Sequence, residues 1–173
     1  MKDSMGLTVP KNESGFSALE VLVVVAVIGI LAGLCIHPLS AFLQRIRLQN
    51  AADNMKHYIL NARIRAVSNS ERHCGVVFRV HAAPKDDTVF AFLEENPPDN
   101  IYTKGKDSLY LSPFVVKKSE AISSRIAVGF PALIVFRGDG SATASAKVVL
   151  TLKANEDTVE VLASTGKVKV VVK

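Results

Sequence analysis

The pattern of apolar and polar positions divides the chain near residue 38. The run VLVVVAVIGILAGLCI (Val21–Ile36) is unbroken, and the segment 16–36 that contains it has only two polar side chains, Ser17 and Glu20. At about 1.5 Å rise per residue, a helix of this length spans roughly 30 Å, the thickness of a bilayer's hydrocarbon core. Because apolar residues do not alternate with polar ones, the many Val and Ile residues do not favour a strand. The pattern predicts a transmembrane helix over residues 16–38.

Residues 39–69 have the spacing of an amphipathic helix. Arg45, Lys56 and Arg63 fall on a separate stripe, which we expect to face solvent; contact of Arg45 or Arg47 with lipid head groups is the alternative. No proline interrupts this segment, so the two helical parts should form one helix that ends near Val67. The apolar positions recur mostly at steps of three, four or seven residues: Leu39, Phe42, Leu43, Ile46, Met55, Ile59, Ala62 and Ala66.

Residues 70–173 contain short β-forming segments separated by breaks rich in Pro, Gly, Asn and Asp. The last three segments alternate apolar and polar residues, which indicates an antiparallel meander with one buried face. The predicted fold class is therefore α+β: a long N-terminal helix, with a membrane-spanning half and an amphipathic half, packed on an antiparallel β-sheet domain. The expected strands are 74–80, 88–93, 109–116, 125–130, 132–136, 147–152, 158–163 and 167–172.

Three ordinary explanations of the N-terminal run fit its surroundings poorly. A cleaved secretory signal peptide has a basic start and an A-x-A-like exit, whereas here acidic residues accompany the lysines and HPLSAFLQR follows the run. A lipoprotein signal places a small residue before its cysteine, and in LAGLC that position is Leu34. A plain membrane anchor accounts for the run but leaves Gly15, Phe16 and Glu20 unexplained.

Those residues carry a resemblance to a known family. The stretch GFSALEVLVVVAVIGILAGL resembles the class III signal of type IV pilins and type II secretion pseudopilins. In that family a prepilin peptidase cleaves after the glycine and methylates the new N-terminal amine, and the fifth mature residue is glutamate. The resemblance implies a cleaved leader over 1–15, cleavage between Gly15 and Phe16, N-methylation of Phe16 and an assembly role for Glu20. It also places Pro38 where the family often has a proline that loosens the helix.

The charge of Glu20 gives the implied assembly role a physical basis. A carboxylate in an apolar environment is costly unless a cation or several hydrogen-bond donors accompany it. Cleavage would create an ammonium group on Phe16, about one helical turn away. In a bundle of such helices, the ammonium group of one subunit can pair with Glu20 of its neighbour and so select the axial register.

The C-terminal part resembles one branch of the family, the GspH/FimT-like minor pseudopilins. FRGDG (Phe136–Gly140) is similar to a late turn that precedes the final hairpins, and STGKVKV stands where the branch often closes with Gly-Arg-x-Arg. In DNA-binding members, arginines of that motif contact DNA. Here Lys167 and Lys169 keep the charge but lack the planar guanidinium. We expect these lysines on the solvent face of a terminal strand, with DNA or another anion as the alternative.

Composition and charge favour a solvated domain without a disulfide framework. The chain has 173 residues, enough for one ordinary domain and an appended segment, and 21 Lys and Arg against 16 Asp and Glu give a net charge of +5. Because the two signs are interspersed, a solvated surface is favoured over a nucleic-acid-binding one. Cys35 lies in the apolar run and Cys74 beyond it, so we expect no disulfide framework.

The sequence has no pattern typical of an active site. RGDGS lacks the lysine and the spacing of a phosphate-binding loop, and His73 and Cys74 are strand neighbours whose side chains should point to opposite faces. The acidic pairs at 86–87 and 94–95 are expected to be solvated. We predict no catalytic residue, metal or cofactor. The histidines show no metal-ligand spacing: His37, His57, His73 and His81.

These features predict a minor pseudopilin of a type II secretion system, a structural subunit of a periplasmic pseudopilus that assists protein export. The alternative is a minor type IV pilin involved in pilus biogenesis or DNA uptake; a membrane-anchored enzyme or binding module is a third class, which would keep an uncleaved N-terminus. The expected partners are the prepilin peptidase, other pilins or pseudopilins in a filament, the inner membrane and a secretion or pilus assembly platform. The expected location is the bacterial inner membrane, crossed once, with the C-terminal domain in the periplasm and available for extraction into a periplasm-spanning filament.

Overall fold

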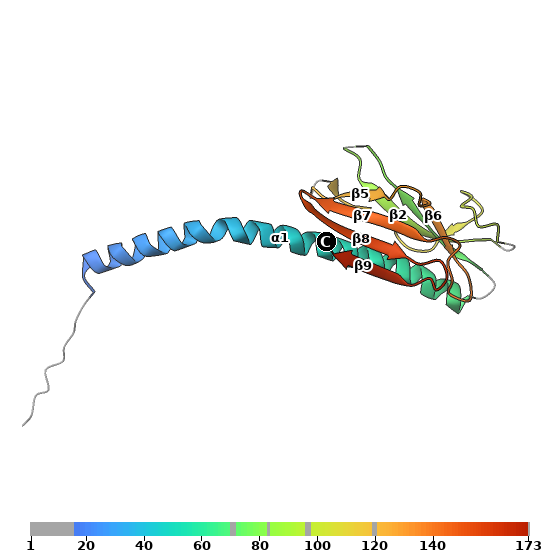
Figure 1. Cartoon of the computed structure of the whole chain (residues 1–173), viewed down its shortest axis with the longest axis horizontal. Coiled ribbons are helices and arrows are strands. Elements are labelled where there is room, and N and C mark those ends of the chain that lie inside the picture. Colours follow the sequence, from blue (N-terminus) through green and yellow to red (C-terminus); the bar gives the residue numbers. More distant parts are fainter. Residues whose placement is uncertain (1–15, 70–71, 83, 96–97, 119–120, 173) are drawn as a thin grey trace, which may run out of the picture. The chain divides into compact units, whose positions relative to one another are not determined.

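The computed structural model describes residues 16–69, 72–82, 84–95, 98–118 and 121–172, and for residues 34–38 it describes the backbone alone. The chain divides into two compact units, Met1–Ala41 and Phe42–Lys173. One helix, α1 (Ala18–Ser68), contributes to both units (Figure 1). The leader predicted over residues 1–15 lies outside the described residues.

Helix α1 confirms the prediction of a single continuous helix, and it ends one residue beyond the expected position. In the second unit its buried residues recur at steps of four and three, so one stripe of the helix faces the domain core. Among the residues that the structure describes, none of the helices has a stretch long and apolar enough to cross a membrane. The side chains of residues 34–38, part of the predicted transmembrane segment, lie outside the described set. The buried stripe is Leu48, Ala52, Met55, Ile59, Ala62 and Ala66.

The second unit contains two antiparallel sheets (Figure 1). Their strands are β1 (Cys74–Arg79), β2 (Asp87–Leu93), β3 (Ser108–Leu109), β4 (Phe114–Val116), β5 (Ser123–Ile126), β6 (Leu133–Phe136), β7 (Ala146–Leu152), β8 (Asn155–Val161) and β9 (Val168–Val172). The first sheet has the order β3-β2-β1-β6, and β4 also pairs with β2. The second sheet has the order β5-β7-β8-β9, which confirms the predicted C-terminal meander.

The number of sheets and one strand differ from the prediction. The sequence predicts one sheet against the helix, whereas the strands divide into two sheets. An alternating pattern identifies a strand but does not identify its partner, so the pairing could not be read from it. The predicted strand 109–116 is two short strands with Pro113 between them, because proline has no N–H to donate to a sheet.

The two sheets are connected by the segment that follows β6. The N–H of Thr143 donates to the carbonyl of Val135 at 2.8 Å, and the N–H of Ala142 donates to the carbonyl of Ala163 at 2.9 Å. This segment therefore bridges β6 in one sheet and the end of β8 in the other.

Within the described chain, β4 pairs only with β2 and β5 pairs only with β7, so both are edge strands.

A hydroxyl group of α1 completes the outer edge of β2. Strands β3 and β4 both pair with this edge, and a gap between them leaves Ala91 without a strand partner on that side. The N–H of Ala91 donates to the hydroxyl oxygen of Tyr58 at 3.0 Å, and its carbonyl accepts from the N–H of Tyr110 at 2.9 Å. The helix is thus joined to the sheet by a hydrogen bond as well as by the apolar core.

A second apolar cluster lies on the opposite face of β2. The rings of Phe90 and Phe92 each meet the ring of Tyr102 edge-on, with centroids 5.0 Å and 4.9 Å apart. A Cβ atom at Gly75 would lie 2.2 Å from the Phe92 ring, so glycine makes room for it. Tyr102, in the connection between β2 and β3, therefore covers an apolar face of the sheet.

Candidate functional site

The start of α1 forms a capping box. The hydroxyl oxygen of Ser17 accepts a hydrogen bond from the N–H of Leu19 at 3.3 Å, and a carboxylate oxygen of Glu20 accepts one from the N–H of Ser17 at 3.4 Å. Each bond satisfies a backbone donor at the helix start, and the carboxylate lies at the positive end of the helix dipole. Glu20 therefore has a partner within its own chain.

The capping role of Ser17 was missed by the sequence reasoning, although the spacing S-x-x-E in SALE is its signature. Phe16 precedes the cap and is 84% exposed. Gly15 lies outside the described residues, so the structure describes only one side of the predicted cleavage site. Cleavage at Gly15–Phe16, methylation of Phe16 and the assembly role of Glu20 stay predictions.

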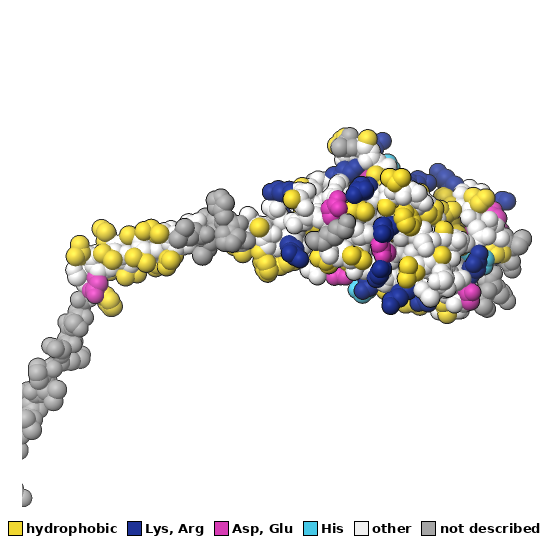
Figure 2. All heavy atoms as spheres, viewed as in Figure 1, with side chains coloured by type: hydrophobic (Ala, Val, Ile, Leu, Met, Phe, Trp, Pro, Cys, Tyr) yellow, Lys and Arg dark blue, Asp and Glu magenta, His cyan; other side chains and the backbone are white. Residues whose placement is uncertain are grey.

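The apolar side chains of α1 from Leu19 to Leu31 are exposed, and Figure 2 shows them along the one face of the helix that is in view. They occupy nearly consecutive positions from Leu19 to Leu31, so they cannot fall on one stripe. A helix that is apolar all round requires an apolar environment on every side. The backbone stays helical through Pro38, and the predicted loosening there is not tested because its side chain lies outside the described set.

Arg63 connects two turns of the C-terminal domain to α1. Its Nε donates to the carbonyl of Gly140 at 2.9 Å, and its Nη2 donates to the carbonyl of Thr165 at 3.0 Å. Gly140 and Gly166 both have positive φ angles, 81° and 59°, and a Cβ atom at Gly166 would lie 2.0 Å from the carbonyl oxygen of Gly140. The expectation that Arg63 faces solvent is therefore wrong, and the two C-terminal motifs FRGDG and STGKVKV meet at this side chain.

Lys169 has a partner in the second sheet. Glu160 on β8 lies between the two neighbouring strands, 2.7 Å from Lys169 Nζ and 2.6 Å from Lys147 Nζ. Hydrogen bonds from Lys147 and Lys169 lower the pKa of the Glu160 carboxyl. Lys167 is exposed, as is Lys169, which fits the prediction of a solvent-facing strand. A DNA or anion contact through this pair stays a prediction, and the Glu160 carboxylate opposes it.

Two carboxylates expected on the surface are buried, so that expectation is wrong for one member of each acidic pair. Asp87 accepts hydrogen bonds from the His81 N–H at 2.7 Å and from the Ser124 hydroxyl at 2.8 Å, and it lies 3.0 Å from Lys118 Nζ. Burial alone would raise the pKa of Asp87, but these donors hold it below its usual value. Asp87 therefore joins β2 in the first sheet to β5 in the second sheet.

Glu94, just beyond the other end of β2, is the opposite case. Its side chain is 1% exposed, neither oxygen has a hydrogen bond of good geometry to a described residue, and the backbone N–H groups of Asn100 and Ile101 offset only part of the cost of burial. His73 Nδ1 lies 3.3 Å away. Burial raises the pKa of Glu94 to about 7, and the carboxylates of Asp99 and Asp107 raise it as well. A carboxyl group in this setting is protonated more readily than one in water.

The cysteines and the possible metal ligands give no further candidate site within the described residues. Burial raises the pKa of the Cys74 thiol to about 12, so the reactive thiolate is scarce at neutral pH. The side chain of Cys35 lies outside the described set. Across the described ranges, there is no cluster of three or more His, Cys, Asp or Glu side chains that could hold a metal ion.

Comparisons with known proteins give a match of structure alone. No family model matches the sequence, and no curated protein matches it. Two crystal structures of the type IV minor pilin FimU of Pseudomonas aeruginosa match the chain with TM-scores of 0.51 and 0.54. The fold is pilin-like. The identities are 13% and 14%, and the matches cover 72% and 75% of this chain and 92% of each FimU chain.

The pilin-like fold confirms the predicted fold class, a long N-terminal helix packed on antiparallel β-structure. The identities are too low to carry more than the fold, so the GspH/FimT-like branch is not established by them. Both matched structures are of a protein described as a type IV minor pilin.

Proposed function

We propose that the chain is a minor pilin-like subunit of a type IV filament, matured at Gly15–Phe16 and inserted through the first half of α1 into a core of similar helices. In this proposal the C-terminal domain lies outside that core in the periplasm. The observation that carries it is the apolar surface of α1 from Leu19 to Leu31, exposed on all sides and headed by the single charge of Glu20. Neighbouring helices or lipid would cover this surface.

The secretion pseudopilin, which the sequence ranks first, becomes the second candidate. The pilin-like fold suits both, but the solved structures that match are of a type IV minor pilin. The second candidate keeps one observation in its favour: the turns of FRGDG and STGKVKV, which resemble the pseudopilin branch, meet at Arg63. A DNA-uptake role through Lys169 is disfavoured, because Glu160 neutralises part of its charge.

The capping box refines the proposed role of Glu20. In the unprocessed chain the carboxylate accepts from the N–H of Ser17, the second residue after the cleavage site. Cleavage would turn the amide nitrogen of Phe16 into a cation next to this group. The carboxylate could then accept from the N–H of Ser17 or pair with the ammonium group of a neighbouring subunit. In an apolar core an unpaired charge is costly, so assembly favours the ion pair.

Two substitutions separate the charge of Glu20 from its capping role. Glu20→Gln keeps an amide oxygen that can accept from Ser17 N–H, as glutamine does in capping boxes, but removes the charge. Glu20→Ala removes both. If the ammonium pairing drives assembly, both variants are processed normally, and both enter filaments at least about tenfold less than the parent. If capping alone matters, Glu20→Gln assembles normally.

The experiment expresses the full chain with its prepilin peptidase, determines the mature N-terminus by mass spectrometry and quantifies the chain in sheared filaments. A mature chain that begins with N-methylated Phe16 is expected. An intact N-terminus, or normal filament incorporation of Glu20→Gln, contradicts the proposal. Dependence of protein export rather than of surface filaments on this chain would favour the secretion candidate.

A further inference from the structure

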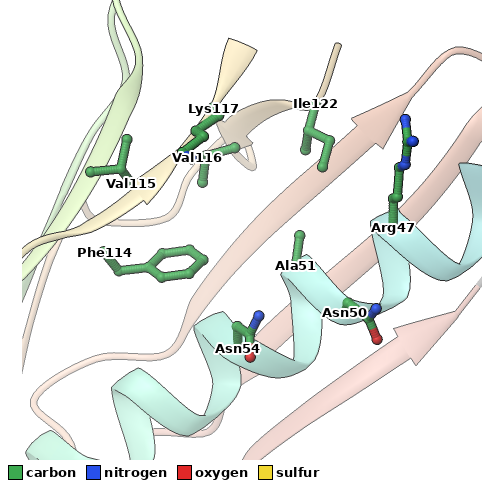
Figure 3. Close-up of a pocket in the computed structure, with 9 residues that line it drawn as sticks. All are labelled: Arg47, Asn50, Ala51, Asn54, Phe114, Val115, Val116, Lys117 and Ile122. Carbon is green, nitrogen blue, oxygen red and sulfur yellow. The ribbon is translucent and has the colours of Figure 1, made fainter. Parts of the chain in front are cut away.

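A groove lies between α1 and strand β4 together with Ile122 (Figure 3). It encloses about 260 Å³, and Ala51 on the helix, Phe114 on β4 and Ile122 point toward this space. Strand β5 begins one residue after Ile122, so the groove lies at the seam between the edge strands of the two sheets. Its lining combines apolar side chains with two cations, Arg47 and Lys117.

The two cations of the groove have no acidic partner within the described residues. The neighbouring Lys118 shows the contrast, because its Nζ lies 3.0 Å from the buried carboxylate of Asp87 and also donates to the carbonyl of His81. Lys117 and Arg47 are exposed and make no ion pair there. The side-chain amides of Asn50 and Asn54 add uncharged donors to the same lining.

The strand beside the groove can accept another strand. β4 pairs with β2 on one edge only, and alternate N–H and C=O groups of an antiparallel strand point away from its partner. An extended peptide that adds to such an edge gains main-chain hydrogen bonds, while pockets beside it select the side chains. Val115, in the middle of β4, is 40% exposed.

We propose that this groove binds an extended, acidic segment of a neighbouring filament subunit, with carboxylates of that segment against Arg47 and Lys117 and its backbone along β4. The proposal rests on the proposed function, since it requires assembly with other subunits. The net positive charge of this chain, +5 in total, favours a different subunit over a second copy as the partner. Charge complementarity steers such encounters and excludes partners of like charge.

Photocrosslinking in cells that assemble the filament tests the proposal. The crosslinking amino acid p-benzoylphenylalanine replaces Val115 in the groove, Val128 as a surface control that is 95% exposed, or Val25 in the apolar half of α1. Mass spectrometry then identifies each crosslinked partner. From position 115 we expect another pilin-like subunit, crosslinked through an acidic segment, and no such product from position 128.

Charge reversal completes the test. The double variant Arg47→Glu/Lys117→Glu should lower the crosslink from position 115 at least about tenfold, while Arg45→Glu/Lys153→Glu, with the same change in net charge outside the groove, should leave it unchanged. Crosslinking of position 115 to a second copy or to lipid, or a product unaffected by charge reversal, overturns the inference. If position 25 crosslinks to pilin-like subunits and position 115 does not, only the inference fails; if neither does, the proposed function fails too.

Discussion

The two halves of α1 place the same kinds of side chain in opposite environments. Ile28, in the first unit, is 58% exposed, whereas Ile59, in the second unit, is 0% exposed. The second half has one apolar stripe and a domain to bury it against. The first half is apolar all round and buries little within the described chain. One helix therefore combines a part stabilised by its own domain with a part whose apolar surface requires other molecules.

This difference shows where each kind of mutation should act. Substitutions in the second half change the stability of the folded domain, because they alter buried contacts. Substitutions in the first half leave that stability unchanged and affect only what surrounds the helix. Three tyrosines, Tyr58, Tyr102 and Tyr110, are the only tyrosines of a chain without tryptophan, and all belong to the second unit. Their near-ultraviolet circular dichroism therefore reports on the domain alone.

The largest expected effect comes from a matched pair of isoleucines. Ile59→Ala leaves a cavity in the core and should lower the free energy of unfolding by about 2–5 kcal/mol. Ile28→Ala should change it by less than about 0.5 kcal/mol, because the side chain is exposed. Chemical denaturation followed by the tyrosine signal, in the same detergent for both variants, measures the two. Equal losses would contradict the division of α1 into two environments.

Removal of Arg63 should have the next largest effect. Arg63→Ala leaves the carbonyls of Gly140 and Thr165 without their donors, and hydrogen bonds to a charged group contribute about 1.5–3 kcal/mol each, so we expect a loss of roughly 3 kcal/mol. Arg45→Ala, on the same helix but exposed, serves as the control and should change stability by less than about 0.5 kcal/mol. The same denaturation experiment compares them. A loss in Arg63→Ala no greater than in the control would show that the two turns hold without it.

Arg63 also shows why part of the site could not be predicted. Periodicity placed the helix, its end and most strands within a few residues, because these depend on neighbours in sequence. The same periodicity assigned Arg63 to the polar stripe of Arg45 and Lys56, since its partners lie 77 and 102 residues away. Nothing local distinguishes an arginine that meets solvent from one that meets two distant turns.

The acidic pairs illustrate a second limit of the sequence. Asp86-Asp87 and Glu94-Glu95 resemble solvated surface, yet Asp87 and Glu94 are buried. Adjacent side chains on extended backbone point to opposite faces, so one member of a pair can turn inward. The capping box was different: Ser17 and Glu20 follow a local pattern, and that part of the site was available from the sequence.

A pH titration should also distinguish the domain from the first half of α1, because Glu94 in the domain makes its free energy of unfolding depend on pH. The pKa of Glu94 is raised to about 7 in the folded state from its usual 4.5. The folded state therefore holds the proton more tightly, so the contribution to stability is complete below pH 4.5 and is lost as pH rises through about 7. Glu94→Gln stays neutral throughout. We expect it to match the parent below that window and to exceed it by up to about 3 kcal/mol above it.

The titration compares the stability of the variant with that of the parent at each pH, so that the contributions of the other titrating groups cancel. Asp87, whose pKa is lowered, acts with the opposite sign and loses its contribution only as pH falls. A stability difference between Glu94→Gln and the parent that does not change with pH would mean that the pKa of Glu94 is the same in the folded and unfolded states. Glu20→Gln, in the first half of α1, should leave the tyrosine-detected titration of the domain unchanged.

The smallest effect is expected at the cap of α1, where it should be confined to the first half. Ser17→Ala removes the oxygen that accepts from Leu19 N–H, and loss of such a cap costs about 1 kcal/mol. Because the first turn is far in sequence from the buried stripe, amide hydrogen exchange should speed up about fivefold over residues 18–22 and stay unchanged over 48–66. Ser17→Asp, which can also cap, should restore slow exchange. Faster exchange along the whole helix would instead mean that its two halves unfold as one unit.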